Sequence, residues 1–386
     1  MDKGKWQSIE LRKVKKEIKR RLAGVAKALL GVFGCCLFIG GLLFLAENGS
    51  PIFYYAVALS SPGSTIEYFG NMAEEGFAAE DAFSGASEEP EQGSPDENDQ
   101  PEEPTEETIK PEKAVPEVPE ERRGKVTETH YSASPGGIYV PYGNAIIKNC
   151  TGYSSEKILS VLKDEHGLYL STDLGDTPQV LIYHTHATEG YEPADRGYFD
   201  VEGTWRSTDP SENMIAVGDA LCAVLTENGI GVVHDGTLHD DPSYNGSYKR
   251  SAVTIKKHLE ENPEIAVCLD IHRDAIEPSK TEIVKPTAVI NGKKAAQIMI
   301  IAGCDDGTMN MPDFFENLKF AAALADKLET LYPGLCRPVL FDYRKYNMDL
   351  SPGLLLIEIG ATGNTLEEAQ YSAELLGNAL VELLAE

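Results

Sequence analysis

The stretch from Val180 to Tyr191, VLIYHTHATEGY, runs from an apolar segment into three side chains that can bind a metal ion. These are His184, His186 and Glu189. The apolar letters are typical of a short buried strand, and side chains two positions apart in an extended chain point to the same side. We therefore expect the two imidazoles on one face, as part of a metal site whose other ligands lie elsewhere in the chain.

Two later strand-like stretches also end in residues that suit hydrolytic chemistry. IAVCLDI is followed directly by His272, and LLLIEI contains Glu358 near its end. In an α/β sheet, ligands gather at the carboxyl ends of the strands, so these side chains are expected at one rim with the first group. His186, Glu189 and His272 would then be the ligands of a catalytic zinc ion (Zn²⁺) with one position open for water. His184 stays open as an alternative to His186.

Glu358 is expected to transfer the proton that such a hydrolysis requires. Burying this carboxylate without a partner would be costly, which makes a purely structural role awkward. Asp270 is expected to face the opposite side of its strand from His272 and to support the fold. Arg273 and Asp274 are expected either to pair with each other or to orient a ligand imidazole. The other histidines are interpreted as surface or hydrogen-bonding residues: His130, His166, His234, His239 and His258.

Strand-like and helix-like patterns alternate from about residue 132 to residue 386. The expected helices span 155–165, 212–227, 248–261, 313–331 and 366–384. The expected strands span 180–183, 231–234, 265–271, 287–290, 297–302, 338–343 and 354–359. This alternation predicts an α/β domain with a mainly parallel sheet and helices on both faces.

The N-terminal segment has the pattern of a membrane anchor. Residues 1–27 are rich in Lys and Arg, and residues 28–46 contain no charged side chain. A helix of that length matches the roughly 30 Å hydrocarbon core of a bilayer. Because the basic residues precede the span, residues 1–27 are expected in the cytoplasm and the rest outside the cell membrane. A cleavable signal peptide is the alternative, although its apolar region is usually only about 7 to 15 residues long.

Residues 47–131 are expected to be an extracytoplasmic linker, which is acidic and rich in proline from about residue 74. Such a composition cannot bury enough apolar surface to offset the entropy of ordering, so the linker is predicted to be disordered. The net charge of -28 and the predicted location outside the cell argue against nucleic acid as a partner.

Four short sequence motifs, in this order, resemble those of a known family: LIYHTHATEGY, NGSYKRS, DIHRDA and LLIEIGATGNTLEEA. Together with the anchor and the acidic linker, they resemble stage II sporulation protein P of spore-forming Firmicutes. The resemblance covers roughly residues 146–386. It implies an amidase-like fold and a zinc-dependent N-acetylmuramoyl-L-alanine amidase that acts on peptidoglycan during engulfment and also cuts the peptide crosslinks. It further implies stage II sporulation proteins D and M as partners.

The resemblance also implies roles for single residues. His272 matches the later zinc histidine of the amidases, and Glu358 matches their catalytic glutamate. Aligning the strand ends places His186 at the first zinc histidine, with His184 as its rival. The third ligand is open between Glu189 and Glu212, because the amidase glutamate lies at the start of the next helix.

Two other function classes stay open at this point. A zinc carbohydrate deacetylase or an esterase would use similar ligands on another substrate, and a tethered scaffold would bind the wall without turnover. A Ser-His-Asp hydrolase is disfavoured because no G-x-S-x-G turn follows any of the strands. The seven cysteines include no CxxC pair, so they give no support to a zinc knuckle.

Overall fold

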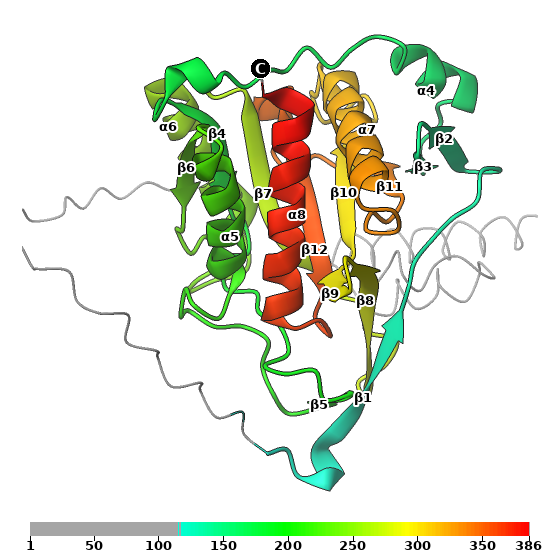
Figure 1. The fold of residues 1–386 in the computed structure, drawn as a ribbon, viewed down its shortest axis with the longest axis vertical. Coiled ribbons are helices and arrows are strands. Elements are labelled where there is room, and N and C mark those ends of the chain that lie inside the picture. Colours follow the sequence, from blue (N-terminus) through cyan, green and yellow to red (C-terminus); the bar gives the residue numbers. More distant parts are fainter. Residues whose placement is uncertain (1–114, 116, 386) are drawn as a thin grey trace, which may run out of the picture. The chain divides into compact units, whose positions relative to one another are not determined.

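The structure is a computed structural model of the chain, and it describes residue 115 and residues 117–385 (Figure 1). The predicted cytoplasmic arm (1–27), the predicted membrane span (28–46) and most of the predicted linker lie outside the described residues. Among the helices that the structure describes, none is both long and apolar enough to cross a membrane.

The larger of two β-sheets contains eight strands in the order β2-β3-β11-β10-β12-β7-β4-β6. The strands are β2 (Tyr139–Tyr142), β3 (Ala145–Asn149), β4 (Pro178–Tyr183), β6 (Gly231–Asp235), β7 (Val267–Asp274), β10 (Ile298–Gly303), β11 (Val339–Asp342) and β12 (Leu354–Ala361). β10 runs antiparallel to β12, and β2 to β3, whereas the other neighbours are parallel. Because β12, β7, β4 and β6 form an unbroken parallel block, their carboxyl ends lie at one edge.

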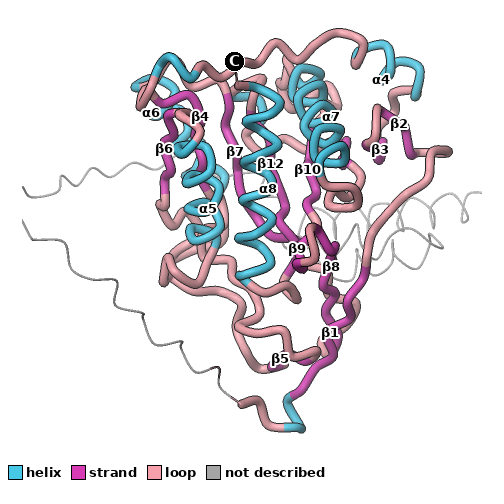
Figure 2. Tube along the Cα trace, in the orientation of Figure 1, coloured by secondary structure: helices cyan, strands magenta, loops and turns pink. Residues whose placement is uncertain are grey.

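The smaller sheet has four strands in the order β5-β1-β8-β9. The strands are β1 (Arg123–Thr129), β5 (Tyr198–Asp200), β8 (Glu282–Ile290) and β9 (Lys293–Ala296), and Figure 2 shows them in magenta. β1 is parallel to β8, while β5 and β9 are antiparallel to their neighbours. The prediction of a mainly parallel sheet is therefore confirmed only in part, since the described residues form two sheets and both are mixed.

The strands that the sequence did not predict are β1, β2, β3, β5 and β9, and all are short or polar. β1, with the sequence RGKVTET, lies inside the stretch predicted as linker, so the folded part begins before residue 132. Its pairing joins Val126 to Ile283, residues far apart in the sequence, and local periodicity carries no information about such a partner. The strands and helices predicted between residues 155 and 386 are all present, with shifted ends.

Three long helices cover one face of the larger sheet, and one helix packs on the other. Helices α5 (Met214–Glu227), α8 (Leu366–Leu384) and α7 (Phe314–Leu331) lie side by side in Figure 1. Helix α6 (Ser247–Glu261) packs on the opposite face, where its Ile255 joins the same core as Leu181 of β4. The short elements are α4 (Ser155–Val161), η1 (Glu120–Arg122), η2 (Thr172–Leu174) and η3 (Met348–Leu350).

Alternate residues of β7 point into two different cores. Leu269 and Ile271 belong to the core beneath α5, α7 and α8, whereas Cys268 belongs to the core beneath α6. Side chains alternate along a strand, so Asp270 and His272 lie on the α6 side. The expectation that Asp270 faces away from His272 is therefore wrong, because residues two apart in a strand share a face.

Candidate metal and catalytic site

The carboxyl ends of β4, β7 and β12 bring together side chains from three distant parts of the chain. β7 lies between the other two strands, and the parallel register places Glu358 of β12 opposite His272 of β7. The turn that follows β4 carries His186 and Glu189 to the same edge. The structure thus places the predicted groups side by side, as the strand topology requires.

His186, His272 and Glu189 are neighbours at this edge, and all three are buried. The ring centroids of the two histidines are 5.3 Å apart, and the rings are nearly perpendicular, at 86°. Oε2 of Glu189 lies 3.7 Å from Nδ1 of His272. The Glu189 carboxylate therefore faces the side of the His272 ring that carries Nδ1.

His184 lies on the other face of the sheet. β4 ends at Tyr183, so the alternation of an extended chain does not continue to His186, and the two imidazoles diverge. Nδ1 of His184 donates a hydrogen bond to the carbonyl oxygen of Ile271 (2.9 Å), and its Nε2 lies 2.9 Å from Nε2 of His234. The expectation that both imidazoles share one face is therefore wrong, and it is His186, not His184, that lies beside His272.

The environment of His184 is that of a structural residue. Burial lowers its pKa to about 3, and the neighbouring His234 contributes to the shift. His234 in turn pairs with Asp219 at 2.9 Å, which makes a polar chain from the core to the surface. Helix α5 packs tightly over this pair, since a Cβ atom on Gly218 would lie only 2.4 Å from Nε2 of His234.

His186 is held by aromatic rings. Tyr244 stacks on it with a centroid distance of 4.3 Å and an angle of 6°, and Tyr248 meets it edge-on at 5.7 Å. Burial and the neighbouring His272 lower its pKa to about 3, so the imidazole is neutral at physiological pH. Its Nδ1 is buried and makes no hydrogen bond to another described residue, although it lies 3.9 Å from Oδ2 of Asp240. A neutral imidazole with an unengaged nitrogen is the form that binds a metal ion.

His272 has the opposite electrostatic setting. Burial lowers its pKa, but Asp270, Glu189 and Glu358 outweigh that effect and raise the pKa to about 9. Nε2 of His272 lies 2.8 Å from Oδ1 of Asp270, although its N–H is oblique to that oxygen, so the contact is ionic rather than an aligned hydrogen bond. A metal ion at Nδ1 would therefore have to replace a proton.

The third predicted ligand was open between Glu189 and Glu212. Glu189 lies on a short two-stranded segment, in which Gly190 N donates to Trp205 O (2.7 Å) and Ser207 N donates to Thr188 O (2.8 Å). The carboxylate of Glu212 instead accepts a hydrogen bond from the Ser207 hydroxyl at 3.1 Å. The structure therefore brings Glu189, rather than Glu212, beside His272.

Glu358 has the properties of a proton-transfer group. Burial, together with the negative charges of Asp274 and Glu189, raises its pKa to about 8, against the opposing effect of His272 and Arg337. Its Oε2 is buried and makes no hydrogen bond to any other described residue. A carboxyl group with a pKa near neutrality, adjacent to a candidate metal ligand, can both accept and return a proton.

The comparisons with known proteins agree with the resemblance. The family described as "Stage II sporulation protein P (SpoIIP)" matches residues 60–381. The chain belongs to the stage II sporulation protein P family. A curated relative, stage II sporulation protein P of Bacillus subtilis, is 33% identical over 220 residues, which cover 54% of this chain and 52% of the relative. The chain thus spans about half the length of the curated relative that it matches.

Solved structures of amidases are similar to part of the chain. An N-acetylmuramyl-L-alanine amidase from Mycobacterium smegmatis is 13% identical and covers 54% of this chain and 98% of its own, with a TM-score of 0.32. The CwlD amidase from Clostridioides difficile, solved in complex with the GerS lipoprotein, is 13% identical and covers 52% of this chain and 94% of its own, with a TM-score of 0.30.

Sequence patterns did not predict a polar cluster beside Glu189. Arg206 donates to the buried carboxylate of Asp240 at 2.7 Å, and its second terminal nitrogen lies 3.6 Å from Oε1 of Glu189. The same Asp240 accepts from the hydroxyl of Thr188 at 2.6 Å. Arg206 also covers the Tyr244 ring, 5.0 Å from its centroid. The signal for this cluster in the sequence was the run LHDDPSYNG, which is rich in polar residues and follows a strand.

The side chains at this edge are of the types that bind zinc, although they are not arranged as a complete metal site. The part of the chain that the structure describes contains no group of three or more His, Cys, Asp or Glu side chains arranged to hold a metal ion. Ligand atoms on a tetrahedral zinc lie about 3.3–3.6 Å apart, given bonds of about 2.0–2.2 Å, and the separation between Oε2 of Glu189 and Nδ1 of His272 is 3.7 Å. Two imidazoles, one of which has a buried Nδ1 that makes no hydrogen bond to another described residue, and a carboxylate fit this ligand chemistry.

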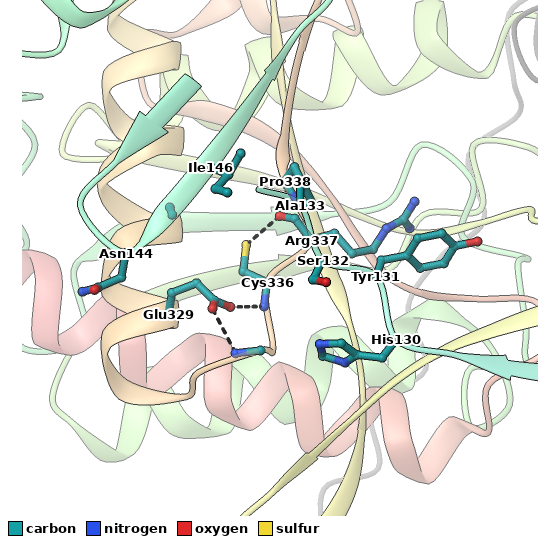
Figure 3. A pocket seen from close by; sticks show the side chains of 12 residues that line it. His130, Tyr131, Ser132, Ala133, Asn144, Ile146, Glu329, Cys336, Arg337 and Pro338 are labelled. Carbon is teal, nitrogen blue, oxygen red and sulfur yellow. Dashed lines mark hydrogen bonds between the residues drawn. The ribbon is translucent and has the colours of Figure 1, made fainter. Parts of the chain in front are cut away.

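A small cavity lies away from this edge and contains none of the candidate residues. Figure 3 shows its lining, which includes Tyr131, Glu329, Cys336 and Arg337. Glu329 accepts hydrogen bonds from the backbone of Gly334 and Cys336, so its carboxylate is already engaged. Arg337 connects the cavity with the candidate site, through an ion pair with Asp274 at 2.8 Å.

Proposed function

We propose that the folded part of this chain is a zinc-dependent peptidoglycan hydrolase that cleaves the amide bond between N-acetylmuramic acid and L-alanine. The observation that carries the proposal is the convergence of His186, Glu189, His272 and Glu358 at one edge of the sheet. Membership of the sporulation family supports wall degradation at the septum and during engulfment as the context. The choice of this amide bond as the site of cleavage is supported by the family resemblance.

His186, His272 and Glu189 would hold the zinc ion. When bound, zinc polarises the scissile carbonyl and lowers the pKa of a bound water towards about 7. Glu358 accepts the proton of the attacking water and then donates it to the nitrogen of the leaving L-alanine. The positive charge of a bound zinc ion would lower the raised pKa of Glu358 towards neutral pH. A group transfers protons most efficiently when its pKa lies near the working pH.

The same site would also hydrolyse the peptide crosslinks, since these are amide bonds that require the same proton transfers. This second activity is supported by the family resemblance.

We further propose that residues 28–46 anchor the protein in the cell membrane with residues 1–27 in the cytoplasm, and that residues 47 to about 115 are the spacer that allows the folded part to reach the wall. Stage II sporulation proteins D and M are the proposed partners, and nucleic acid is not expected as one.

Digestion of purified peptidoglycan by the full chain in detergent micelles tests this function. An amidase releases stem peptides with a free N-terminal L-alanine and leaves denuded glycan strands. A deacetylase or an esterase would release acetate without free L-alanine, and a scaffold would bind the wall and release nothing. Either of these outcomes contradicts the proposal, provided that the protein is loaded with zinc and His272→Ala serves as the inactive control.

A further inference from the structure

Asp270 is a fully buried carboxylate whose charge no apolar core would tolerate alone. Its exposed fraction is 0%, and it lies on the α6 face of β7, two residues before His272. Removing such a charge from water is costly unless nearby donors or cations compensate it. Its partners should therefore reveal why the chain keeps a carboxylate at this position.

Among the described residues, the hydrogen-bond and ion-pair partners of Asp270 belong to the two segments that carry the candidate histidines. Oδ1 accepts the backbone N–H of Thr185 at 2.8 Å, and Oδ2 accepts the Thr185 hydroxyl at 2.7 Å. Oδ1 also lies 2.8 Å from Nε2 of His272. Thr185 directly precedes His186, so one carboxylate connects the turn after β4 with the end of β7.

A second layer of contacts extends this network to two other elements. The Thr185 hydroxyl lies 2.8 Å from the hydroxyl of Ser251 on α6, and Asn347 donates to Ser251 at 3.1 Å. Asn347 has a φ of 58°, in the left-handed region that residues other than glycine rarely adopt. Asn is among the residues that adopt this conformation most readily, and here it directs the Asn347 amide onto Ser251.

We propose that Asp270 is a positioning residue for the metal site, a role that rests on the proposed zinc function. Its Oδ1, 2.8 Å from Nε2 of His272, favours the tautomer that carries its proton on Nε2 and leaves Nδ1 for the metal on the side that faces Glu189, 3.7 Å away. Through Thr185, it also fixes the turn that presents His186. The oblique N–H of the metal-free state is expected to align, as such contacts often tighten when a site is filled.

The chain offers a matched pair for comparison. Oδ2 of Asp235, at the end of β6, lies 2.7 Å from Nε2 of His258, so this is a second carboxylate, largely buried, that is paired with an imidazole. His258 lies on α6 and is not a candidate ligand. Removing the carboxylate of Asp235 should affect the fold alone, whereas removing that of Asp270 should affect the metal site as well.

The test is the zinc dissociation constant of the full chain in detergent, measured by competition with a chelator. Asp270→Asn should weaken zinc binding by about 10- to 100-fold, and Thr185→Val should weaken it by a smaller factor. Asp235→Asn should leave zinc affinity within about twofold of wild type, although its melting temperature falls. Cobalt absorption spectra should change for Asp270→Asn and stay unchanged for Asp235→Asn, since they report ligand geometry independently of activity.

A folded Asp270→Asn variant with wild-type zinc affinity and an unchanged cobalt spectrum would overturn the proposal. If that variant does not fold, Thr185→Val decides, and unchanged affinity there also overturns it. A wild-type chain that binds no zinc removes both this proposal and the proposed function. A wild-type chain that binds zinc but releases no L-alanine from the wall contradicts the function alone, and the affinities of the variants still test the role of Asp270.

Discussion

The two faces of β4 and β7 hold the same kinds of side chain in opposite states. On the face beneath α5 and α8, both ring nitrogens of His184 are engaged, by Ile271 and His234. On the α6 face, His186 and Glu358 each keep a buried atom without a hydrogen-bond partner among the described residues. Buried polar groups are nearly always satisfied, so these two atoms are open to a partner that the chain itself does not supply, such as a water molecule or a metal ion. The difference separates a histidine that stabilises the fold from one that is positioned to react.

The largest effect is expected from His272→Ala, which removes a ligand from the reactive face. Zinc binding and the release of L-alanine from peptidoglycan should both fall below detection. The measurements are zinc content after dialysis and the appearance of new amino termini. A variant that retains one zinc ion per chain would place the metal elsewhere and remove the contrast between the two faces.

Glu358→Gln should lower kcat by about 100- to 10,000-fold, as expected when a proton-transfer group is lost, while zinc binding persists. The measurements are the rate of L-alanine release at saturating peptidoglycan and the zinc content of the variant. Equal loss of zinc would instead make Glu358 a ligand.

The same substitution should change stability with pH in metal-free protein. The folded-state pKa of Glu358, about 8, lies above that of an unfolded glutamate, so wild-type stability falls as the pH rises from about 4.5 through 8. Glutamine lacks this titration, so at pH 7 the variant should be more stable by about 3 kcal/mol, with little difference at pH 4. Urea unfolding in the presence of a chelator at the two pH values measures this, and equal stability differences at both would contradict the buried, raised pKa.

Glu189→Gln and Glu212→Gln form a matched pair that tests the third ligand. Loss of Glu189 should weaken zinc binding by more than the roughly 10- to 100-fold that removing a ligand's hydrogen-bond partner costs. Loss of Glu212, which bonds to Ser207, should leave the affinity nearly unchanged. The reverse result in chelator competition would transfer the role to Glu212.

On the face beneath α5 and α8, His184→Leu should affect only the stability of the fold. The change removes the partner of the Ile271 carbonyl and of Nε2 of His234, so the free energy of unfolding should fall by about 1–3 kcal/mol. Urea unfolding measures this loss, and zinc affinity should remain within about twofold of wild type. A large loss of zinc affinity in a folded variant would make His184 part of the metal site after all.

The smallest effect tests the packing of α5 over this face. Gly218→Ala would normally stabilise a helix by about 1 kcal/mol, but here the new methyl group meets the ring of His234 at 2.4 Å. The close approach is expected to reverse the sign and destabilise the protein by about 1–3 kcal/mol. A stabilised variant, seen as a raised melting temperature, would show that His184 and His234 move aside to accommodate the methyl group.

Sequence patterns predicted the strand ends well because apolar runs followed by His or Glu report local structure. The prediction that His186, His272 and Glu358 lie close together came only from the general rule that the carboxyl ends of parallel strands share an edge. The patterns could not separate His184 from His186, since that choice depends on where β4 stops, at Tyr183. They also missed the role of Asp240 and the pairing of β1 with β8, because both depend on contacts between residues far apart in the chain.

Anomalous diffraction at the zinc absorption edge, from crystals of the zinc-loaded protein, would locate the metal relative to the two faces of the sheet. We expect one strong peak bonded to ring nitrogens of His186 and His272 and to the carboxylate of Glu189, at about 2.0–2.2 Å, with Glu358 beside it. A peak between His184 and His234, or no peak in protein that digests the wall, would contradict the proposed zinc site.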